Sequence, residues 1–279
     1  MLLTDFLKLP KGQARIFILT GGLIIFVIVM MAIFAPFIAP YNPTKGIGPV
    51  LQPPCLKYLM GTDNLGRDIF SRVVYGSRIV LVIVATAGFI SMLIGVTLGL
   101  ISGYLGGKFD RIFAMIMDSI YAFPSLILAI AISAILGPSI VNAIIAIAIV
   151  YIPTFYRMIR GQTLSLKTRL FVEAAKVIGA SDFRILTKYI LVNLIPTVAV
   201  IFSLCIADAI ITAAGLSFLG FIVTAPTPDW GWDLSSGRDY LPAGFWWLIT
   251  FPGLMIVLLA FGFALLGEGL NEIYSKEDK

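Results

Sequence analysis

The sequence contains no histidine and few charged residues of any kind. Only 13% of its 279 residues are charged, against about 25% in ordinary soluble domains. Without histidine there is no histidine metal ligand, no Ser-His-Asp triad and no histidine proton relay. We therefore predict that the chain is not an enzyme and has no catalytic and no metal-binding residues.

Cysteine and phosphate-binding patterns are also scarce. Cys55 and Cys205 are far apart in the sequence, so a disulfide framework or a redox pair is not expected. The glycine-lysine pair that ends at Lys108 is not followed by Ser or Thr, and Ser102 stands where a phosphate-binding loop needs its first glycine. We expect no cofactor on this chain; if ATP and magnesium drive it, another chain binds them.

Long apolar runs are what the sequence has in abundance. A helix needs about 20 apolar residues to cross a hydrocarbon core of about 30 Å. Such runs occupy residues 16–38, 79–102, 112–136, 140–158, 190–220 and 245–267. They lack the alternation of membrane strands, and a helix satisfies its own backbone in lipid. We predict an all-α polytopic membrane protein with six transmembrane helices.

The distribution of positive charge predicts the orientation. If both termini are cytoplasmic, the cytoplasmic segments hold most of the 20 lysines and arginines, as the positive-inside rule requires. The first run is too long for a signal peptide and ends near Pro36 and Pro40, so it is expected to remain as an anchor. The net charge of +5 then needs no nucleic-acid partner.

The predicted organisation has three parts. Residues 1–38 form the cytoplasmic N-terminus and first span, residues 39–78 an external loop, and residues 79–279 a five-helix core. The external loop ends in an amphipathic stretch, which predicts a short helix lying in the membrane interface. Its apolar face holds Ile69, Phe70, Val73 and Val74, and its polar face holds Arg67, Asp68, Ser71 and Arg72.

Glycine and tryptophan each follow a pattern. Small residues at four-residue spacing in the second span predict close packing against another helix; they are Gly95, Gly99, Gly103 and Gly107. All four tryptophans lie in or beside the last external loop, which favours an interfacial aromatic belt over a ligand cage. They are Trp230, Trp232, Trp246 and Trp247, of which the first two are also candidates for a second, binding role.

Residues 159–189 interrupt the apolar sequence with charges. Apolar residues at helical spacing lead to Gly179, which is placed to end a helix, and Ser181 can cap a second helix with Asp182 in its first turn. This pattern predicts a cytoplasmic helix-turn-helix hairpin. It is either a solvated loop made positive for topology or a docking element, in which Ala174 and Ala175 allow close approach beside polar contacts. Those contacts come from Glu173 and Lys176.

Five stretches, in consistent order along the chain, carry a family resemblance. They are GTDNLGRDIFSRVVYGSR (61–78), AFPSL (122–126), EAAKVIGASDFRI (173–185), LSFLG (216–220) and PTPDWGWDLSSGRDYL (226–241). They resemble the second permease of the dipeptide, oligopeptide and nickel ABC importers. The resemblance implies a type I permease fold in the prokaryotic inner membrane. It also implies a homologous second permease, two cytoplasmic ATPase subunits and an external solute-binding protein as partners.

The resemblance and the chemistry of the residues together give three groups of candidate site residues. The ATPase-coupling group is Glu173, Ala174, Ala175, Lys176, Gly179, Ala180, Ser181 and Asp182. The external docking group is Asp63, Arg67, Asp68, Trp230 and Trp232. Asp208 and Asp118 are candidates for the translocation path, since an acid inside a span avoids lipid; for Asp208 a helix-packing role is equally open.

The expected function is one half of a translocation path for di- or oligopeptides, operating by alternating access. Nickel chelates or oligosaccharides are alternative cargoes within the same importer class. A secondary transporter driven by an ion gradient fits the spans but gives no reason for the hairpin. An intramembrane enzyme is poorly supported, because no paired catalytic constellation occurs in the spans.

Overall fold

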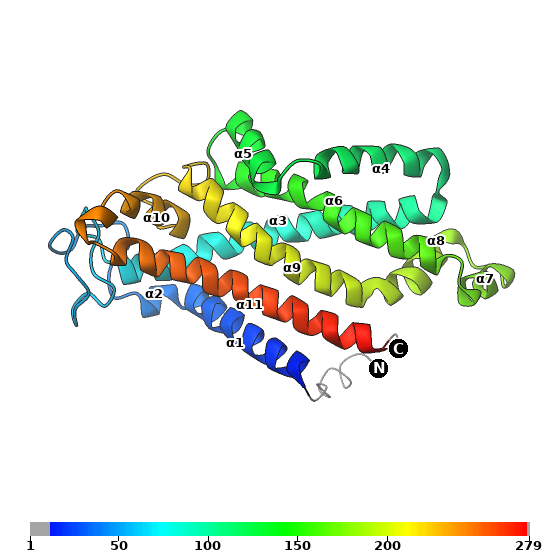
Figure 1. Ribbon diagram of the computed structural model, residues 1–279, viewed down its shortest axis with the longest axis horizontal. Helices are drawn as coiled ribbons and strands as arrows, with labels where there is room; N and C mark the ends of the chain where they lie inside the picture. Colours follow the sequence, from blue (N-terminus) through cyan, green and yellow to red (C-terminus); the bar gives the residue numbers. More distant parts are fainter. Residues whose placement is uncertain (1–11, 278–279) are drawn as a thin grey trace.

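The computed structural model describes residues 12–277, and its regular elements are helices (Figure 1). The all-α prediction is therefore confirmed. The elements are α1 (Gln13–Ile33), α2 (Ala35–Ile38), α3 (Ile69–Leu105), α4 (Gly107–Tyr121), α5 (Ser125–Leu136), α6 (Ile140–Leu166), α7 (Leu170–Val177), α8 (Asp182–Arg184), the π-helical turn η1 (Ile185–Ile190), α9 (Leu191–Phe218), α10 (Trp230–Arg238), the 3₁₀ turn η2 (Leu241–Ala243) and α11 (Trp247–Glu277).

Five helical segments of the described chain are long and apolar enough to cross a membrane: α1, α3, α6, the segment from α8 through α9, and α11. The predicted span 112–136 is instead the pair α4 and α5, bent by 92°. Pro124 lies at this break with ψ 130°, and the residue before a proline is disfavoured in helical conformation. The predicted number of six holds when this bent pair is counted as one span.

The glycine ridge of α3 packs against α6. A Cβ added to Gly95 would lie 2.5 Å from Phe155 Cβ, and one added to Gly103 would lie 2.8 Å from Thr163 Cβ. Gly99 is equally close to the α6 backbone. The predicted close packing of these glycines against another helix is therefore confirmed at these three positions. It is wrong for Gly107, which begins α4 with φ +65° and open space around it.

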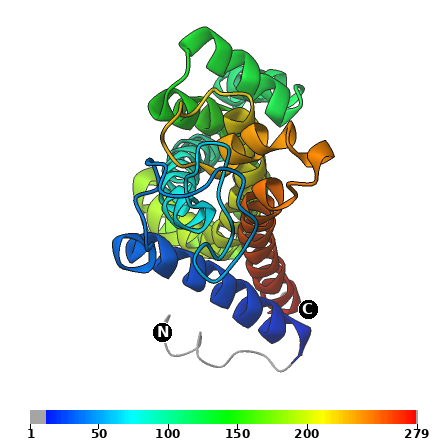
Figure 2. The same cartoon turned by 90° about the vertical axis from the view of Figure 1, so that its left-hand side faces the viewer.

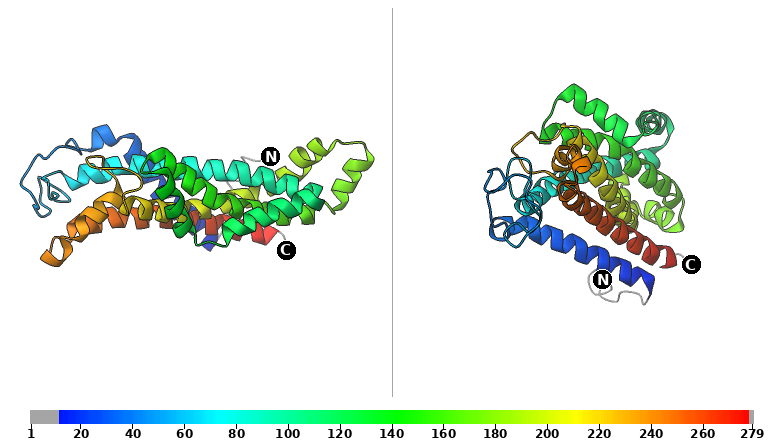
Figure 3. Two further views of the ribbon diagram at one scale, coloured as in Figure 1. Left: turned by 90° about the horizontal axis from the view of Figure 1, so that it is seen from above. Right: turned by 60° about the vertical axis from the view of Figure 1, so that its left-hand side comes forward.

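The helices form an elongated bundle with different structures at its two ends. The loop 39–68 and α10 lie at one end, which we call the loop end, and α7 lies at the other, the hairpin end (Figures 1 and 3). Figure 2 shows α4 and α5 on one side of the bundle and α1 on the opposite side. The start of α1 and the end of α11 point toward the hairpin end (Figure 1). Residues 1–11 and 278–279, the termini predicted to be cytoplasmic, lie outside the described residues.

The predicted interfacial helix at residues 69–78 is not a separate element. Helix α3 begins at Ile69 and continues unbroken to Leu105. Asp68 caps it: its Oδ2 accepts hydrogen bonds from the Ser71 backbone N–H at 2.8 Å and from the Ser71 hydroxyl at 2.6 Å. The supposed polar face is buried by contacts with the external loops, so its pattern reflected internal hydrogen bonding and not contact with water.

Candidate functional sites at the two ends of the bundle

The turn of the hairpin has the geometry predicted for it. Gly179 has φ +79°, a conformation that side chains with a Cβ disfavour. Its N–H donates to Lys176 O at 3.0 Å, and the Ala180 N–H donates to Ala175 O at 3.0 Å. These two bonds form a Schellman motif, which satisfies the last carbonyls of α7. The backbone here therefore requires glycine.

The second arm of the hairpin is tied to the end of α3. Ser181 occupies the predicted N-cap position of α8, but its side chain makes no capping hydrogen bond. Asp182 Oδ1 instead accepts a hydrogen bond from the Tyr104 hydroxyl at 2.5 Å. Lys176 Nζ lies 5.5 Å from the centroid of the same tyrosine ring, within cation–π range. Tyr104 was not predicted, because an aromatic residue at the end of an apolar span gives no local signal of this role.

The hairpin presents an apolar surface to its surroundings. Val172 and Ala175 are buried against the rest of the chain, so the expectation that Ala175 contacts a partner is wrong. Glu173, Ala174 and Lys176 are exposed. The large exposed apolar side chains, which we call the hairpin patch, are Leu170 (81% exposed), Val177 (87%), Ile178 (76%) and Phe183 (77%). A cluster of this kind is typical of a protein–protein contact.

Two ion pairs join α4 to α6. Asp110 accepts from Arg160 through both carboxylate oxygens, at 2.5 and 2.7 Å. Asp118 forms a looser, exposed pair with Arg157 at 3.1 Å, and the Arg157 guanidinium lies over the Tyr121 ring. Asp118 lines an open groove between the two helices. Its countercharge comes from its own chain, so it is not an isolated acid.

Asp208 lies on an exposed side of α9. Its Oδ2 accepts a hydrogen bond from the Tyr151 hydroxyl at 2.7 Å, and the same hydroxyl lies 2.9 Å from Thr212 Oγ1. Tyr151 and Thr212 are both buried. The structure thus brings α6 and α9 together around this carboxylate, a contact that the sequence alone did not indicate.

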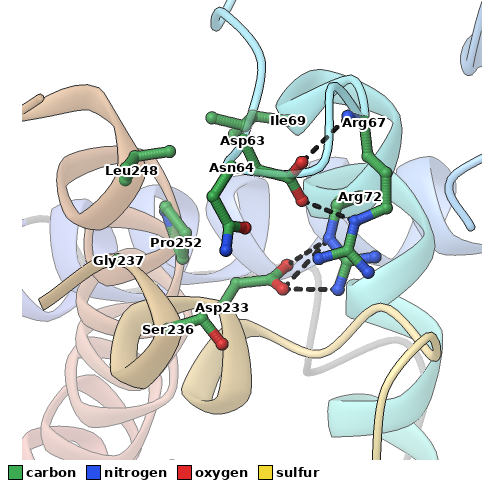
Figure 4. A pocket seen from close by; sticks show the side chains of 10 residues that line it. All are labelled: Asp63, Asn64, Arg67, Ile69, Arg72, Asp233, Ser236, Gly237, Leu248 and Pro252. Carbon is green, nitrogen blue, oxygen red and sulfur yellow. Dashed lines mark hydrogen bonds and ion pairs between the residues drawn. The ribbon is translucent and has the colours of Figure 1, made fainter. Parts of the chain in front are cut away.

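The loop end contains a buried network of charged side chains (Figure 4). Arg72, only 1% exposed, binds Asp233 of α10 through Nε and Nη2, at 2.5 to 3.1 Å. Its Nη1 donates to Pro43 O at 2.9 Å and to Pro226 O at 3.0 Å. Arg67 Nε pairs with Asp63 Oδ2 at 2.5 Å. Arg72 therefore joins α3, α10 and two external loops.

Two acids at α10, Asp229 and Asp233, have raised pKa values. Burial raises the pKa of Asp233 to about 6, although the Arg72 guanidinium opposes this shift. Burial also raises the pKa of Asp229. Asp229 Oδ1 accepts hydrogen bonds from the Ser217 hydroxyl and, at 3.0 Å, from the Trp232 backbone N–H, so it caps α10. It therefore fixes α10 to the end of α9.

Most of the predicted docking residues at the loop end are structural. Asp63, Arg67 and Asp68 are buried. Trp230 is fully buried, and its Nε1 donates to Val73 O at 2.8 Å. Trp232 is partly exposed. The aromatic-belt prediction is wrong for Trp230 and Trp247, which are both buried, whereas Trp246 is exposed. Tertiary hydrogen bonds to distant carbonyls hold the buried indoles, and local sequence does not reveal them.

Within residues 12–277, His, Cys, Asp and Glu form no group of three or more that could hold a metal ion. The apolar helices instead define an integral membrane protein that has an exposed hairpin at one end. Residues 95–276 match the family described as the binding-protein-dependent transport system inner membrane component, and the chain belongs to this family. Residues 17–54 match the N-terminal TM domain of oligopeptide transport permease C. The protein is thus a multi-pass permease of the bacterial inner membrane.

Curated relatives cover most of the chain. It is 42% identical to the probable D,D-dipeptide transport system permease protein DdpC of Escherichia coli (strain K12), over 91% of this chain and 85% of the relative. It is 42% identical to the dipeptide transport system permease protein DppC of Alkalihalophilus pseudofirmus, over 96% and 87%. It is 44% identical to the glutathione transport system permease protein GsiD of Escherichia coli O157:H7, over 91% and 84%.

A solved structure has the same fold. A chain of the MetNI methionine ABC transporter, in an inward-facing conformation, superposes with a TM-score of 0.60 at 18% identity. The superposition covers 75% of this chain and 97% of that chain. The predicted ABC importer permease fold is therefore confirmed.

Proposed function

We propose that this permease forms half of the translocation path of an ATP-driven importer of di- or oligopeptides. A homologous second permease supplies the other half, an external solute-binding protein delivers the cargo, and two cytoplasmic ATPase subunits bind ATP and magnesium. The hairpin at residues 170–184 transmits the movement of the ATPases. The chain itself binds no cofactor.

The observation that carries this proposal is the hairpin patch, which lies at one tip of the bundle. Leu170, Val177, Ile178 and Phe183 expose apolar area that water disfavours. A rigid turn at Gly179 presents them, as a docking element requires. The curated relatives that are named for dipeptide and glutathione transport support a peptide cargo.

The contacts of the hairpin suggest how a displacement of it would be transmitted to the transmembrane helices. Tyr104 links it to the end of α3 through Asp182 and Lys176. The turn η1 continues directly into α9. Helices α3 and α9 pack against α6 and α11, so a displacement of the hairpin would reach most of the bundle. In alternating access this displacement would open the path to the loaded binding protein.

The proposed coupling is tested by charging the patch. The importer is reconstituted in proteoliposomes with its partner subunits, and ATP-dependent dipeptide uptake is measured. Val177→Asp should abolish ATPase co-purification and uptake while leaving the permease folded, because an unpaired charge would be desolvated in the contact. Ser165→Asp, an exposed position at the end of α6, is the matched control and should retain uptake.

Three results would contradict the proposal. Normal coupling in Val177→Asp would exclude the hairpin patch as the ATPase contact. Uptake of a nickel chelate or an oligosaccharide by the wild-type importer, without uptake of any dipeptide, would replace the peptide cargo within the same importer class. Uptake that follows an ion gradient and continues without ATP would exclude the ABC mechanism.

The proposed orientation is tested with the native cysteines. Cys55 is exposed in the external loop, whereas Cys205 is buried. A membrane-impermeant maleimide should therefore label Cys55 in intact cells. In a Cys55→Ser background, Ser165→Cys should be labelled only after the membrane is opened. The reverse pattern would place the hairpin outside and exclude it as an ATPase contact.

A further inference from the structure

Helix α9 carries an exposed carboxylate in the middle of an apolar span. Leu204, Asp208 and Ile211 are exposed on one helical face, which we call the α9 stripe. The middle of α11, by contrast, exposes Leu254, Val257 and Phe261, all apolar and suited to lipid. A carboxylate inside a span is costly in lipid, so we expect Asp208 to face a polar surrounding.

The Asp208 carboxyl group is held in place by hydrogen bonds but has no basic partner among the described residues. The buried Tyr151 hydroxyl donates to Oδ2 at 2.7 Å and lies 2.9 Å from Thr212 Oγ1. None of the ion pairs among residues 12–277 includes Asp208. Asp118 and Asp110, by contrast, each pair with an arginine of α6. A cation that meets this carboxylate can therefore come from outside the chain.

We infer that Asp208, positioned by Tyr151 and Thr212, is a subsite in the translocation path for a protonated amine or guanidinium group of the cargo. This inference rests on the proposed function. A carboxylate with a fixed orientation forms charge-assisted hydrogen bonds with such groups. A single contact of this kind attracts a cationic cargo while still permitting release, which conduction along a path requires.

The test compares two dipeptides of opposite side-chain charge. Uptake of Ala-Lys and of Ala-Glu is measured in proteoliposomes that contain the complete importer. Asp208→Asn should lower the ratio of the Ala-Lys rate to the Ala-Glu rate about tenfold, the change expected when a charge-assisted hydrogen bond is lost. Asp208→Glu should restore most of the ratio, and Tyr151→Phe should lower it about threefold.

The control variant adds a polar side chain to the α9 stripe and leaves the Asp208 carboxylate unchanged. Ile211→Asn places an amide one helical turn away and should leave the ratio unchanged. ATP hydrolysis stimulated by the binding protein should persist in all four variants.

Three outcomes would overturn the inference. An equal loss of both dipeptides in Asp208→Asn would show a packing role. An unchanged ratio in both Asp208→Asn and Tyr151→Phe would remove Asp208 from the path. Loss of the second permease on purification of Asp208→Asn would assign the countercharge to that partner. If the wild-type importer takes up neither dipeptide, the proposed function fails as well, and this result is separate from any change in the ratio.

Discussion

The two ends of the bundle use charged and apolar side chains in opposite ways. At the loop end, the buried Arg72 pairs with Asp233, whose side chain is 11% exposed, and donates to backbone carbonyls. At the hairpin end, Val177 and Ile178 are apolar and more than three-quarters exposed. The Arg72 network is therefore satisfied within one chain, whereas the hairpin patch leaves its apolar side chains exposed.

This difference predicts which substitutions destabilise the permease and which uncouple it. Removing one member of a buried, hydrogen-bonded ion pair leaves an uncompensated charge and costs about 3 to 5 kcal/mol. Changes at the exposed hairpin leave the bundle intact, because few of its side chains contribute to the core. Loop-end variants should fail in folding, and hairpin variants should fail in transport.

The largest effect is expected at Arg72. Arg72→Ala leaves Asp233 without its partner and releases the carbonyls of Pro43 and Pro226. We expect a loss of about 3 to 5 kcal/mol of stability, seen as little monodisperse permease after detergent extraction and a lower thermal midpoint. Arg238→Ala is the control, since its pair with Asp239 is 63% and 73% exposed and should cost less than about 0.5 kcal/mol. Equal stability of the two variants would contradict the structural role of the network.

The loss in Arg72→Ala should also depend on pH. Asp233 has a pKa raised to about 6, above that of an unfolded Asp, so its contribution to stability is greatest in acid and falls as the pH rises through about 6. Arg72 lowers this pKa, so its removal extends the fall in stability to higher pH and makes the total loss larger. The difference in thermal midpoint between Arg72→Ala and wild type should therefore be larger at about pH 7.5 than at about pH 5. A difference independent of pH would exclude Asp233 as the group left uncompensated.

The next effect concerns transport and not folding. Gly179→Val forces a branched side chain into φ +79°, which costs about 1 to 2 kcal/mol. Insertion should remain normal, while ATPase co-purification and uptake fall by about tenfold. Gly161→Val is the control, because Gly161 also has open space around its Cα but an ordinary helical backbone. A similar loss in both variants would show that bulk, and not backbone conformation, is responsible.

Local signals allowed part of this structure to be predicted from the sequence. The apolar runs identify the spans, Gly179 marks the turn, and the spacing of Gly95, Gly99 and Gly103 marks the α3 contact with α6. Each of these follows from a rule that acts over one or two helical turns. Local sequence is therefore sufficient to predict these helices and the turn between them.

What could not be predicted depends on contacts between distant residues. Arg72 binds Asp233, 161 positions away, and Trp230 binds the Val73 carbonyl, 157 positions away. An exposed amphipathic helix and a buried polar face have the same local pattern, so the sequence alone predicts Arg67 and Asp68 to be surface residues although they are buried. The same limit applies to Tyr104 and Tyr151, whose hydroxyls act on acids of other helices.

The smallest effect is expected at the contact between the hairpin and the end of α3. Tyr104→Phe removes the hydroxyl that binds Asp182 at 2.5 Å but keeps the ring beneath Lys176. One hydrogen bond contributes about 0.5 to 1.5 kcal/mol, so the permease should fold normally. Uptake per ATP hydrolysed should fall about two- to threefold, because the hairpin can move without carrying α3 with it.

The matched control is Tyr121→Phe, which removes a hydroxyl at the end of α4 next to α5 and should leave the ratio of uptake to hydrolysis unchanged. Asp182→Asn should reproduce part of the Tyr104→Phe loss, since an amide oxygen accepts the same hydrogen bond more weakly than a carboxylate. If Tyr104→Phe lowers hydrolysis and uptake in proportion, the tyrosine sets the affinity for the ATPases. A fall in uptake alone means that Tyr104 transmits the movement from the hairpin to α3.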